Sequence, residues 1–546
     1  MGALATWWGP LNSGGAPAGA YDTITWTTFS QAAGDRIIYV SDSIGNDAWD
    51  GYGSTAPLVG TVGPKKTIAA GLALLRDGFA DWCLLKKGDT FTNQTFGTWS
   101  KSGRSSAQKM LIGSYGTGVR PKIDTNLSGL VSGGGAAISH VAFTGFEAYP
   151  GSYNGSNADP EGMRFVGQQS DDILIENVYV HSYSFNVDVQ GVNIGNVYPL
   201  FNSITNVTIR GSTLYGAYRN TGTTVEGIYA FNVNGLTVEF CSLDTNGYIV
   251  PTQQTVLRRN AYIDNVNANV VFKNNWFFYT DGIQLRCGGQ LTNNVFSRET
   301  ISMSLGGGSA PIDPAGVSVQ CEDNVVLEGT APSAGAGGDC WAVYIDNLTG
   351  GTIKRNIIAS SQSTGAPTVF RMEIHNGTDP IVCQNVDISN NVAYNWGGYS
   401  LYLRHGQSFY GGNTFANNVF QNPTNAHFYG PENGSIIFVQ NQQSSAQFSH
   451  SSNTYCLAPG ATWYVEGYVS DHTLTTFLAD IGDSGSNNTP VAYADPTRTV
   501  ATYYASIGGS ADHDAFTAAV RAMDKDTWDN AKTAPAMVVY MKAGFV

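Results

Sequence analysis

A five-residue unit recurs through the middle and later parts of the chain. An apolar residue is followed by two variable residues, by a fourth residue that is usually Asn, and by an apolar or small fifth residue. The ten copies read LIENV, IRGST, VEFCS, FKNNW, LTNNV, CEDNV, IKRNI, ISNNV, FANNV and HSSNT. Their fourth residues are Asn177, Ser212, Cys241, Asn275, Asn294, Asn324, Asn356, Asn391, Asn418 and Asn453, and the mean spacing is about 31 residues. A period of about 20–50 residues is typical of solenoids, so the sequence predicts a stack of similar coils.

Each copy lies in a run of short segments with apolar residues at alternate positions, the pattern of half-buried β-strands. One such run is too small to bury its own apolar face, so successive copies must stack to make a continuous core. Asn suits a recurring corner because it tolerates left-handed backbone geometry, and stacked side-chain amides can bond from coil to coil. We therefore predict a β-solenoid with loops of variable length.

The composition agrees with an all-β fold and argues against some functions. Glycine is abundant at 65 residues, and charged residues make up only 13% of the chain, as in proteins built of strands and turns. The net charge of −14 disfavours general nucleic-acid binding, which needs a basic surface. Seven scattered cysteines without CxxC spacing indicate buried thiols rather than a disulfide framework or a zinc site.

The copies IKRNI, ISNNV and FANNV, together with the opening segments IYVSDSIGNDAWDG, KKTIAAGLALL and LLKKGDTF, resemble the right-handed parallel β-helix (pectate-lyase-like) superfamily. The resemblance covers about residues 36–460 and implies a right-handed parallel β-helix of about ten or more coils. That superfamily includes polysaccharide lyases, glycoside hydrolases, epimerases and phage tailspikes. It implies a polysaccharide partner, and the sequence carries no family-specific catalytic signature that would select one activity.

Four parts are expected along the chain: an N-terminal arm or attachment segment (1–34), an N-terminal cap and first coils with one helix (35–130), the parallel β-helix (131–460), and a helical C-terminal cap (461–546). The helix of the N-terminal cap is predicted over Pro64–Arg76. Helical patterns at 471–483 and 511–546 predict a cap over the open end of the solenoid, where bare strand edges would otherwise be exposed. The N-terminus lacks the basic and long apolar regions of a secretory signal, and no apolar run is long enough to span a bilayer.

Six further alternating strands predict one outward column of side chains, because alternation sends the neighbours of inward apolar residues outward. The column is Tyr229/Phe231, Gln284/Arg286, Ser302/Ser304, Tyr344/Asp346, Arg371/Glu373 and Tyr402/Arg404. Neighbouring coils lie about 4.8 Å apart. Asp346 and Glu373 are therefore expected one coil apart, with arginines beside them.

Two carboxylates at that separation suit hydrolysis of a glycosidic bond, in which one protonates the leaving oxygen and the other attacks or activates water. The predicted catalytic residues are Asp346, Glu373, Arg371 and Arg404, and the predicted substrate-binding residues are Tyr344, Tyr402, Arg286, Gln284 and Tyr229. In a lyase, Arg371 or Arg404 would instead neutralise a uronate carboxylate while a nearby Tyr or Arg removes the C5 proton. A third interpretation is a ladder of surface ion pairs without a catalytic role.

The leading functional hypothesis is a β-helix protein that recognises and cleaves a polysaccharide as a tailspike-type depolymerase of a virion. It would be a homotrimer that attaches to a tail or surface partner through its arm, located in the virion tail or outside the cell, without nucleic-acid or membrane partners. The alternatives are a secreted bacterial hydrolase or lyase, and a non-catalytic glycan-binding adhesin or structural solenoid. No cofactor is expected; calcium at Asp47 and Asp50 is the alternative, although a Gly-Asn-Asp…Asp-Gly loop is more typical of a plain turn.

Overall fold

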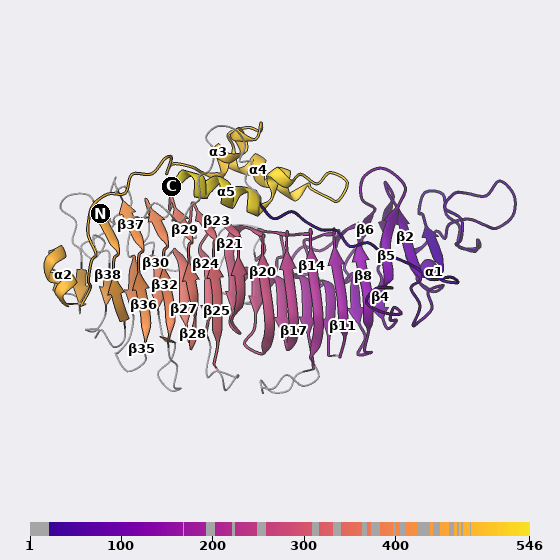
Figure 1. Cartoon of the computed structure of the whole chain (residues 1–546). Helices are drawn as coiled ribbons and strands as arrows, with labels where there is room; N and C mark the ends of the chain where they lie inside the picture. The colour runs from indigo at the N-terminus through magenta and orange to yellow at the C-terminus, as the bar shows by residue number, and fades with distance from the viewer. Residues whose placement is uncertain are drawn as a thin grey trace.

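The computed structural model describes residues 21–167, 169–192, 203–220, 224–247, 258–307, 316–330, 340–362, 368–372, 383–396, 400–403, 410–422, 437–439, 448–457, 464–466, 469–470, 473–480 and 482–546. The described chain forms a long solenoid whose strands stack side by side along one axis (Figure 1). The strands belong to three parallel sheets, here called A, B and C, and successive coils add one strand to each sheet in that order. The predicted all-β parallel β-helix is confirmed.

Sheet A contains β1 (Ile37–Val40), β2 (Trp82–Lys86), β5 (Met110–Tyr115), β8 (Ser139–Thr144), β11 (Asp171–Glu176), β14 (Ile204–Arg210), β17 (Val233–Glu239), β20 (Asn267–Lys273), β22 (Gly289–Thr292), β25 (Ser318–Glu322), β28 (Gly350–Lys354), β32 (Val386–Ser389), β36 (Asn413–Ala416) and β39 (Phe448–Ser451). Sheet B contains β3 (Thr90–Thr92), β6 (Lys122–Asp124), β9 (Glu147–Tyr149), β12 (Tyr179–His181), β15 (Thr213–Tyr215), β18 (Ser242–Asp244), β21 (Trp276–Leu285), β23 (Val295–Glu299), β26 (Val325–Leu327), β29 (Ile357–Ala359), β33 (Val392–Tyr394), β37 (Val419–Asn422) and β40 (Thr454–Leu457).

Sheet C contains β4 (Gly97–Trp99), β7 (Val131–Gly133), β10 (Glu161–Val166), β13 (Phe185–Gln190), β16 (Val225–Phe231), β19 (Arg258–Ile263), the second half of β21, β24 (Ile301–Gly306), β27 (Trp341–Asp346), β30 (Thr368–Met372), β34 (Leu401–Leu403), β38 (Ile437–Val439), β41 (Tyr464–Glu466) and the antiparallel β42 (Val469–Ser470). Two short strands, β31 (Cys383–Gln384) and β35 (Tyr410–Gly411), pair with each other outside these sheets.

Alternating strands fill the interior with apolar side chains. In β27, Val343 and Ile345 are fully buried, while Tyr344 between them is half-buried on the outer face. The same pattern on successive strands builds one continuous core along the solenoid, as expected when single coils cannot bury their own faces.

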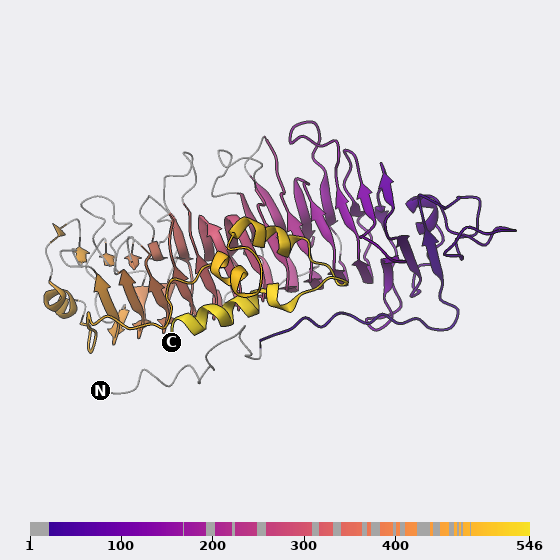
Figure 2. The same ribbon diagram turned by 90° about the horizontal axis from the view of Figure 1, so that it is seen from above.

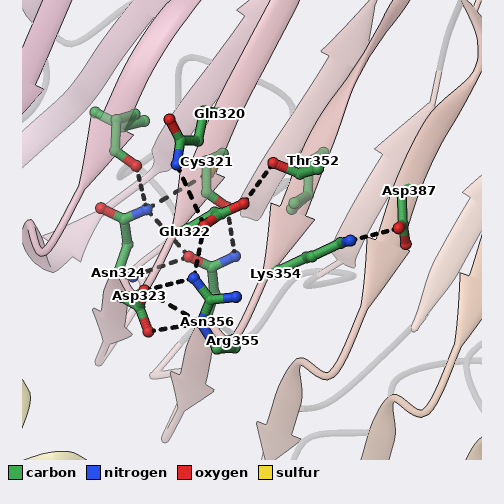
Figure 3. A network of polar contacts seen from close by, with 12 residues as sticks. Gln320, Cys321, Glu322, Asp323, Asn324, Thr352, Lys354, Arg355, Asn356 and Asp387 are labelled. Carbon is green, nitrogen blue, oxygen red and sulfur yellow. Dashed lines mark hydrogen bonds and ion pairs between the residues drawn. The ribbon is translucent and has the colours of Figure 1, made fainter.

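An asparagine ladder runs through the corner between sheets A and B. Each Oδ1 accepts bonds from the backbone N–H and side-chain amide of the Asn one coil earlier. For example, Asn324 Nδ2 donates to Asn356 Oδ1 over 3.0 Å (Figure 3). Asn356 Nδ2 in turn donates to Asn391 Oδ1 over 2.9 Å. The ladder is unbroken through Asn275, Asn294, Asn324, Asn356, Asn391, Asn418 and Asn453. The predicted coil-to-coil role of these residues is confirmed.

Two details of the predicted ladder are wrong. The residue with left-handed backbone geometry is the one before the ladder Asn, for example Arg355 at φ 56°. Asn177 itself has φ 58° and lies one position before the ladder. Glu176 pairs with Arg210, and the Val178 N–H donates to Ser212 Oγ. The residue of this coil at the ladder position is therefore Val178. Asn177 Oδ1 instead accepts from Arg120 and from the backbone N–H of Lys525.

Charged side chains lie just outside the ladder. Arg355 bridges Glu322 and Asp323 over 2.6 and 2.8 Å (Figure 3). Lys542 of the last helix lies 2.7 Å from Asp323. These contacts tie neighbouring coils to one another and to the C-terminal part of the chain.

The N-terminal end of the solenoid is covered by one short helix and a loop. Helix α1 spans Ile68–Leu72 and begins after Thr67, whose side chain accepts from the Ala70 N–H. It is shorter than the predicted Pro64–Arg76, because Lys65 exchanges backbone bonds with β1 and so stays extended: the Lys65 N–H donates to Tyr39 O, and the Ser41 N–H donates to Lys65 O.

The C-terminal helices divide between two places. Helix α2 (Leu474–Asp480) packs Leu474 and Leu478 against the solenoid core near its end. The chain then returns, and α3 (Val500–Ser506), α4 (His513–Arg521), the single turn η3 (Asn530–Lys532) and α5 (Ala534–Gly544) lie along the outer face of sheet B (Figures 1 and 2). The cap expected from the sequence therefore extends along a flank, where it covers apolar side chains such as Trp276 and Leu327.

The described part of the predicted arm, residues 21–32, forms a strap on the solenoid (Figure 2). Thr27 donates its N–H and Oγ1–H to the buried carboxylate of Glu176 over 3.1 and 2.9 Å. Phe29 packs on Leu111 and Leu174 of the outer face of sheet A, and Trp26 meets Trp528 edge to face at 5.1 Å. None of the helices in the described part of the chain is both long and apolar enough to cross a bilayer.

Candidate functional site

A groove of about 820 Å³ follows the outer face of sheet C. Its lining comes from β10, β13, β16, β19, β21, β24, β27 and β30, eight successive strands of the sheet. Neighbouring strands of a sheet lie about 4.8 Å apart, so these eight strands make a groove roughly 34 Å long. That length accommodates an extended ligand with several repeating units.

Two columns of side chains line the groove, and they are three residues apart on each strand. The first column is Glu161, Phe185, Glu226, Arg259, Asp281, Ile301 and Trp341, and the second is Arg164, Asp188, Tyr229, Tyr262, Gln284, Ser304, Tyr344 and Arg371. Two inward residues lie between the columns, where the strand bends. Gly227 occupies one such bend, and a Cβ there would lie 2.6 Å from Asn260 O.

The second column contains most of the outward column predicted from the sequence. Tyr229, Gln284, Ser304, Tyr344, Arg371 and Tyr402 share one register through successive strand pairs. Arg286 and Asp346, each two residues further on, also line the groove. Glu373 and Arg404 lie outside the described residues, so the expected Asp346–Glu373 pair has one described member.

The centre of the groove holds an arginine between two carboxylates. Arg259 pairs in register with Glu226 on one side and with Asp281 on the other, and all three are nearly buried. Burial lowers the pKa of Arg259, and the neighbouring charges, Asp281 before Glu226, oppose that shift. Arg259 Nη1 also donates to Gln284 Oε1.

Glu226 is the most deeply buried of these three residues. Only 2% of the residue is exposed, and its Oε2 accepts no hydrogen bond from any residue that the structure describes. Burial raises the pKa of Glu226 to about 8, and the charge of Asp188 adds to the effect while Arg259 opposes it. A neutral carboxylic acid facing a groove can donate a proton to a bound ligand.

A third carboxylate, Asp188, lies one strand earlier. Burial raises the pKa of Asp188 to about 7, although Gln190 donates to its Oδ1 over 2.8 Å and Arg164 Nε lies 3.5 Å from Oδ2. Glu161 also forms an ion pair with Arg164. Asp188 therefore has polar partners on both oxygens, unlike Glu226.

Aromatic rings and arginines continue along the groove. Tyr229 and Tyr262 stack with their ring centres 5.6 Å apart, and Arg286 Nη1 donates to Tyr262 Oη over 2.5 Å. Burial raises the pKa of Tyr262 while Arg286 opposes the shift. Towards the other end, the Arg371 guanidinium lies 3.9 Å from the centre of the Trp341 ring and 5.1 Å from that of Tyr402.

The sequence analysis missed five groove residues near the centre: Glu226, Arg259, Asp281, Tyr262 and Asp188. Strict alternation of inward and outward residues predicts the second column correctly. It predicts that the other outward residue lies two positions earlier on each strand, whereas the first column lies three positions earlier. The usable signal was the spacing of three in Glu226/Tyr229, Arg259/Tyr262, Asp281/Gln284 and Trp341/Tyr344.

The loop proposed as a calcium alternative has the geometry of a turn. Asp47 accepts from the backbone N–H groups of Lys66 and Thr67 over 2.8 and 2.9 Å, and Asp50 Oδ1 accepts from that of Tyr52 over 2.9 Å. No cluster of three or more His, Cys, Asp or Glu side chains suited to a metal occurs within the described ranges.

Comparisons with known proteins give only distant likenesses. No family model matches the sequence, and no curated protein matches it significantly. A GH136 lacto-N-biosidase from Eubacterium ramulus is similar in structure with 14% identity, a TM-score of 0.37, and coverage of 74% of this chain and 66% of that one. A mannuronic acid specific family 6 polysaccharide lyase from human gut microbiota shows 16% identity, a TM-score of 0.38 and coverage of 76% and 87%. Pectate lyase Pel9A is similar with 14% identity, a TM-score of 0.32, and coverage of 66% of this chain and 79% of that one.

Similarity at this level carries no information on substrate or reaction, and the fold rests on the strand pairing described above. Three parallel sheets built by successive coils define the architecture. The chain is therefore a parallel β-helix.

Proposed function

We propose that the protein hydrolyses a polysaccharide bound along sheet C, with Glu226 as the general acid and Asp281 as the general base. The observation that carries the proposal is the buried carboxyl of Glu226 in a long open groove, with an Oε2 that accepts no hydrogen bond from the described residues. Glu226 would protonate the glycosidic oxygen as the bond to the anomeric carbon breaks. Asp281 would take a proton from the water that attacks this carbon from the opposite face.

The register of the two carboxylates supports an inverting reaction. Glu226 and Asp281 are two strands apart in the same column, which separates their backbone positions by roughly 10 Å. Carboxyl groups about 6.5–9.5 Å apart leave room for the attacking water, whereas retaining enzymes hold them about 5–5.5 Å apart. We place the acid at Glu226 because its carboxyl lies near the centre of the groove, two strands from Asp281 in the same column.

The experiment is hydrolysis of a panel of polysaccharides by the wild type, Glu226→Gln, Asp281→Asn and Asp346→Asn. The Glu226 and Asp281 variants should lose about 10²–10⁴-fold in rate, and Asp346→Asn should stay within a few-fold of the wild type. NMR of the first product should show inversion at the anomeric carbon. Full activity in Glu226→Gln would refute the acid assignment.

The same assay tests the other activities. Products with the ultraviolet absorbance of an unsaturated sugar would indicate a lyase, in which the arginines neutralise a uronate. The raised pKa of Tyr262 keeps its phenol protonated at neutral pH, so that this tyrosine has no free lone pair of a phenolate with which to take the C5 proton, and this favours hydrolysis. Binding of a glycan without any cleavage would indicate an adhesin.

The biological setting we propose is a tailspike-type depolymerase of a virion, assembled as a homotrimer and held by a tail or surface partner, with a secreted enzyme as the alternative. The long groove on the outer face of sheet C supports action on a polymer at a cell surface. Light scattering of the full chain tests the assembly: a monomeric mass would contradict the tailspike version and leave the hydrolysis proposal standing.

A further inference from the structure

The described lining of the groove carries no excess of positive charge. Its cationic side chains are four arginines, and neither lysine nor histidine occurs among the described residues that line it. Burial raises the pKa of Glu226 to about 8 and that of Asp188 to about 7. Even with these two counted as neutral, four of the six acidic side chains remain charged against four arginines. The six acidic side chains are Glu161, Asp188, Glu226, Asp264, Asp281 and Asp346.

Two of the four arginines are paired with acidic side chains of the groove. Arg164 forms an ion pair with Glu161, and its Nε lies 3.5 Å from Asp188 Oδ2. Arg286 Nη1 lies 3.6 Å from Asp264 Oδ1. A uronate at either arginine would compete with a carboxylate that the fold already holds there, and the two like charges would repel each other.

The other two arginines also have neighbours in the groove that interact with their charge. The charges of Asp281 and Glu226, on the two adjoining strands, act on Arg259. The guanidinium of Arg371 lies 3.9 Å from the centre of the Trp341 ring, in a cation–π contact. All four arginines of the described lining are therefore engaged by groups of the protein itself.

Uncharged hydrogen-bonding groups occupy the middle of the second column. They lie on the five successive strands from β16 to β27 of sheet C, and they are Tyr229, Tyr262, Gln284, Ser304 and Tyr344. A hydroxyl group donates and accepts hydrogen bonds, and a side-chain amide does both as well. Sugar hydroxyls have the same double capacity, so this row is complementary to an uncharged polymer.

We infer that the polymer bound along sheet C is an uncharged polysaccharide, whose sugars carry no carboxylates or other anionic groups. The inference rests on the proposed function for the place of binding, and it adds the class of substrate. A polyuronate carries a carboxylate on each sugar, and a surface that binds such a polyanion needs complementary positive charge. An uncharged chain leaves the arginine–carboxylate contacts of the groove intact.

The test measures binding of the full chain to polymers that differ only in charge. Polygalacturonate, alginate and hyaluronate are each used in the native form and after reduction of their carboxyl groups to alcohols, beside uncharged glucans, galactans and mannans. The protein should bind at least one uncharged polymer and should bind no native polyuronate more tightly than its reduced form. Between about 50 and about 500 mM NaCl the Kd should change less than about twofold, because salt screens only charged contacts.

A pair of charge variants tests the cause of this selectivity. Asp264→Asn removes the acidic partner of Arg286, so the affinity for a native polyuronate relative to its reduced form should rise roughly three- to tenfold. Asp387→Asn is the matched control, because it removes the acidic partner of Lys354 on sheet A, away from the groove (Figure 3). The control should leave this affinity ratio as it is in the wild type.

Binding and cleavage separate this inference from the hydrolase. Preference for a native polyuronate, with a Kd that rises about tenfold or more with salt, would overturn the inference, and reducing ends released from that polymer would still support hydrolysis. Binding of an uncharged polymer without cleavage would uphold the inference and refute the hydrolase. Binding of none of the uncharged polymers, or an unchanged affinity ratio in Asp264→Asn, would also overturn the inference.

Discussion

At the scale of residues, buried polar side chains in this protein are of two kinds, those with all their hydrogen bonds made and those with an atom left without a partner. Buried amides in the ladder satisfy one another, so Asn356 donates to Cys321 O over 3.0 Å and to Asn391 Oδ1 over 2.9 Å. Glu226, equally buried, has an oxygen without a partner among the described residues. A satisfied buried polar group fixes structure, and an unsatisfied one at a groove is available for chemistry.

The ladder predicts opposite effects for two reciprocal substitutions. Cys241 occupies a ladder position with a thiol, and Sγ lies 3.5 Å from Ile209 O, where an Asn amide would donate. Cys241→Asn should extend the ladder and stabilise the fold by about 1 kcal/mol. Asn356→Cys should destabilise it by about 3 kcal/mol, because it removes Asn356 Oδ1, which accepts from both the backbone N–H and Nδ2 of Asn324. Thermal unfolding of both variants measures this, and shifts of the same sign would contradict it.

At the scale of elements, α4 is attached to sheet B through a buried histidine. His513 Nε2 lies 2.8 Å from Ser297 Oγ and Nδ1 lies 3.0 Å from Tyr279 Oη. The charged groups around the ring are Asp514 on the same helix, Arg298 after Ser297, and Glu328 beyond β26. Burial lowers the pKa of His513 below 6.5, and the charge of Arg298 adds to this shift while Glu328 and Asp514 oppose it.

This attachment should weaken in acid. A histidine whose pKa is lower in the docked state stabilises docking fully above about pH 6.5, and the contribution is lost as pH falls below that value, because the undocked state binds the proton more tightly. Hydrogen exchange of α4 should therefore accelerate between pH 7 and pH 5. His513→Gln should remove this dependence.

A matched variant separates titration from contact. Ser297→Ala removes the hydroxyl but keeps the histidine, so α4 should be less protected at every pH and should retain the acid response. If His513→Gln responds to acid as the wild type does, another group controls the docking of α4.

At the scale of the whole molecule, the outer faces of the three sheets differ in what covers them. The strap puts Phe29 on sheet A, and the C-terminal helices cover much of sheet B (Figures 1 and 2). Sheet C carries the groove. A functional site on sheet C is consistent with this division, because the groove follows the outer face of that sheet.

A substitution that weakens the packing of α3, α4 and α5 on sheet B should therefore leave the groove on sheet C unchanged. Phe516 is fully buried and meets Trp276 edge to face at 5.1 Å. Phe516→Ala should weaken docking of the flank by about 3–5 kcal/mol, so limited proteolysis should cut within residues 490–546 first. Glycan binding and the hydrogen exchange of sheet C should stay unchanged, and loss of both would show that the flank supports the entire solenoid.

The sequence by itself determined the solenoid, its Asn corner and the second groove column, because these depend on local alternation and on a repeat that each coil must satisfy. It could not place Glu226, Arg259 and Asp281, because the strand bend between the columns changes the spacing from two to three residues. It also left open where the C-terminal helices pack. Only the tertiary structure brings Glu226, Arg259 and Asp281 side by side in one groove, nearly buried, since this arrangement depends on strands more than 20 residues apart in the chain.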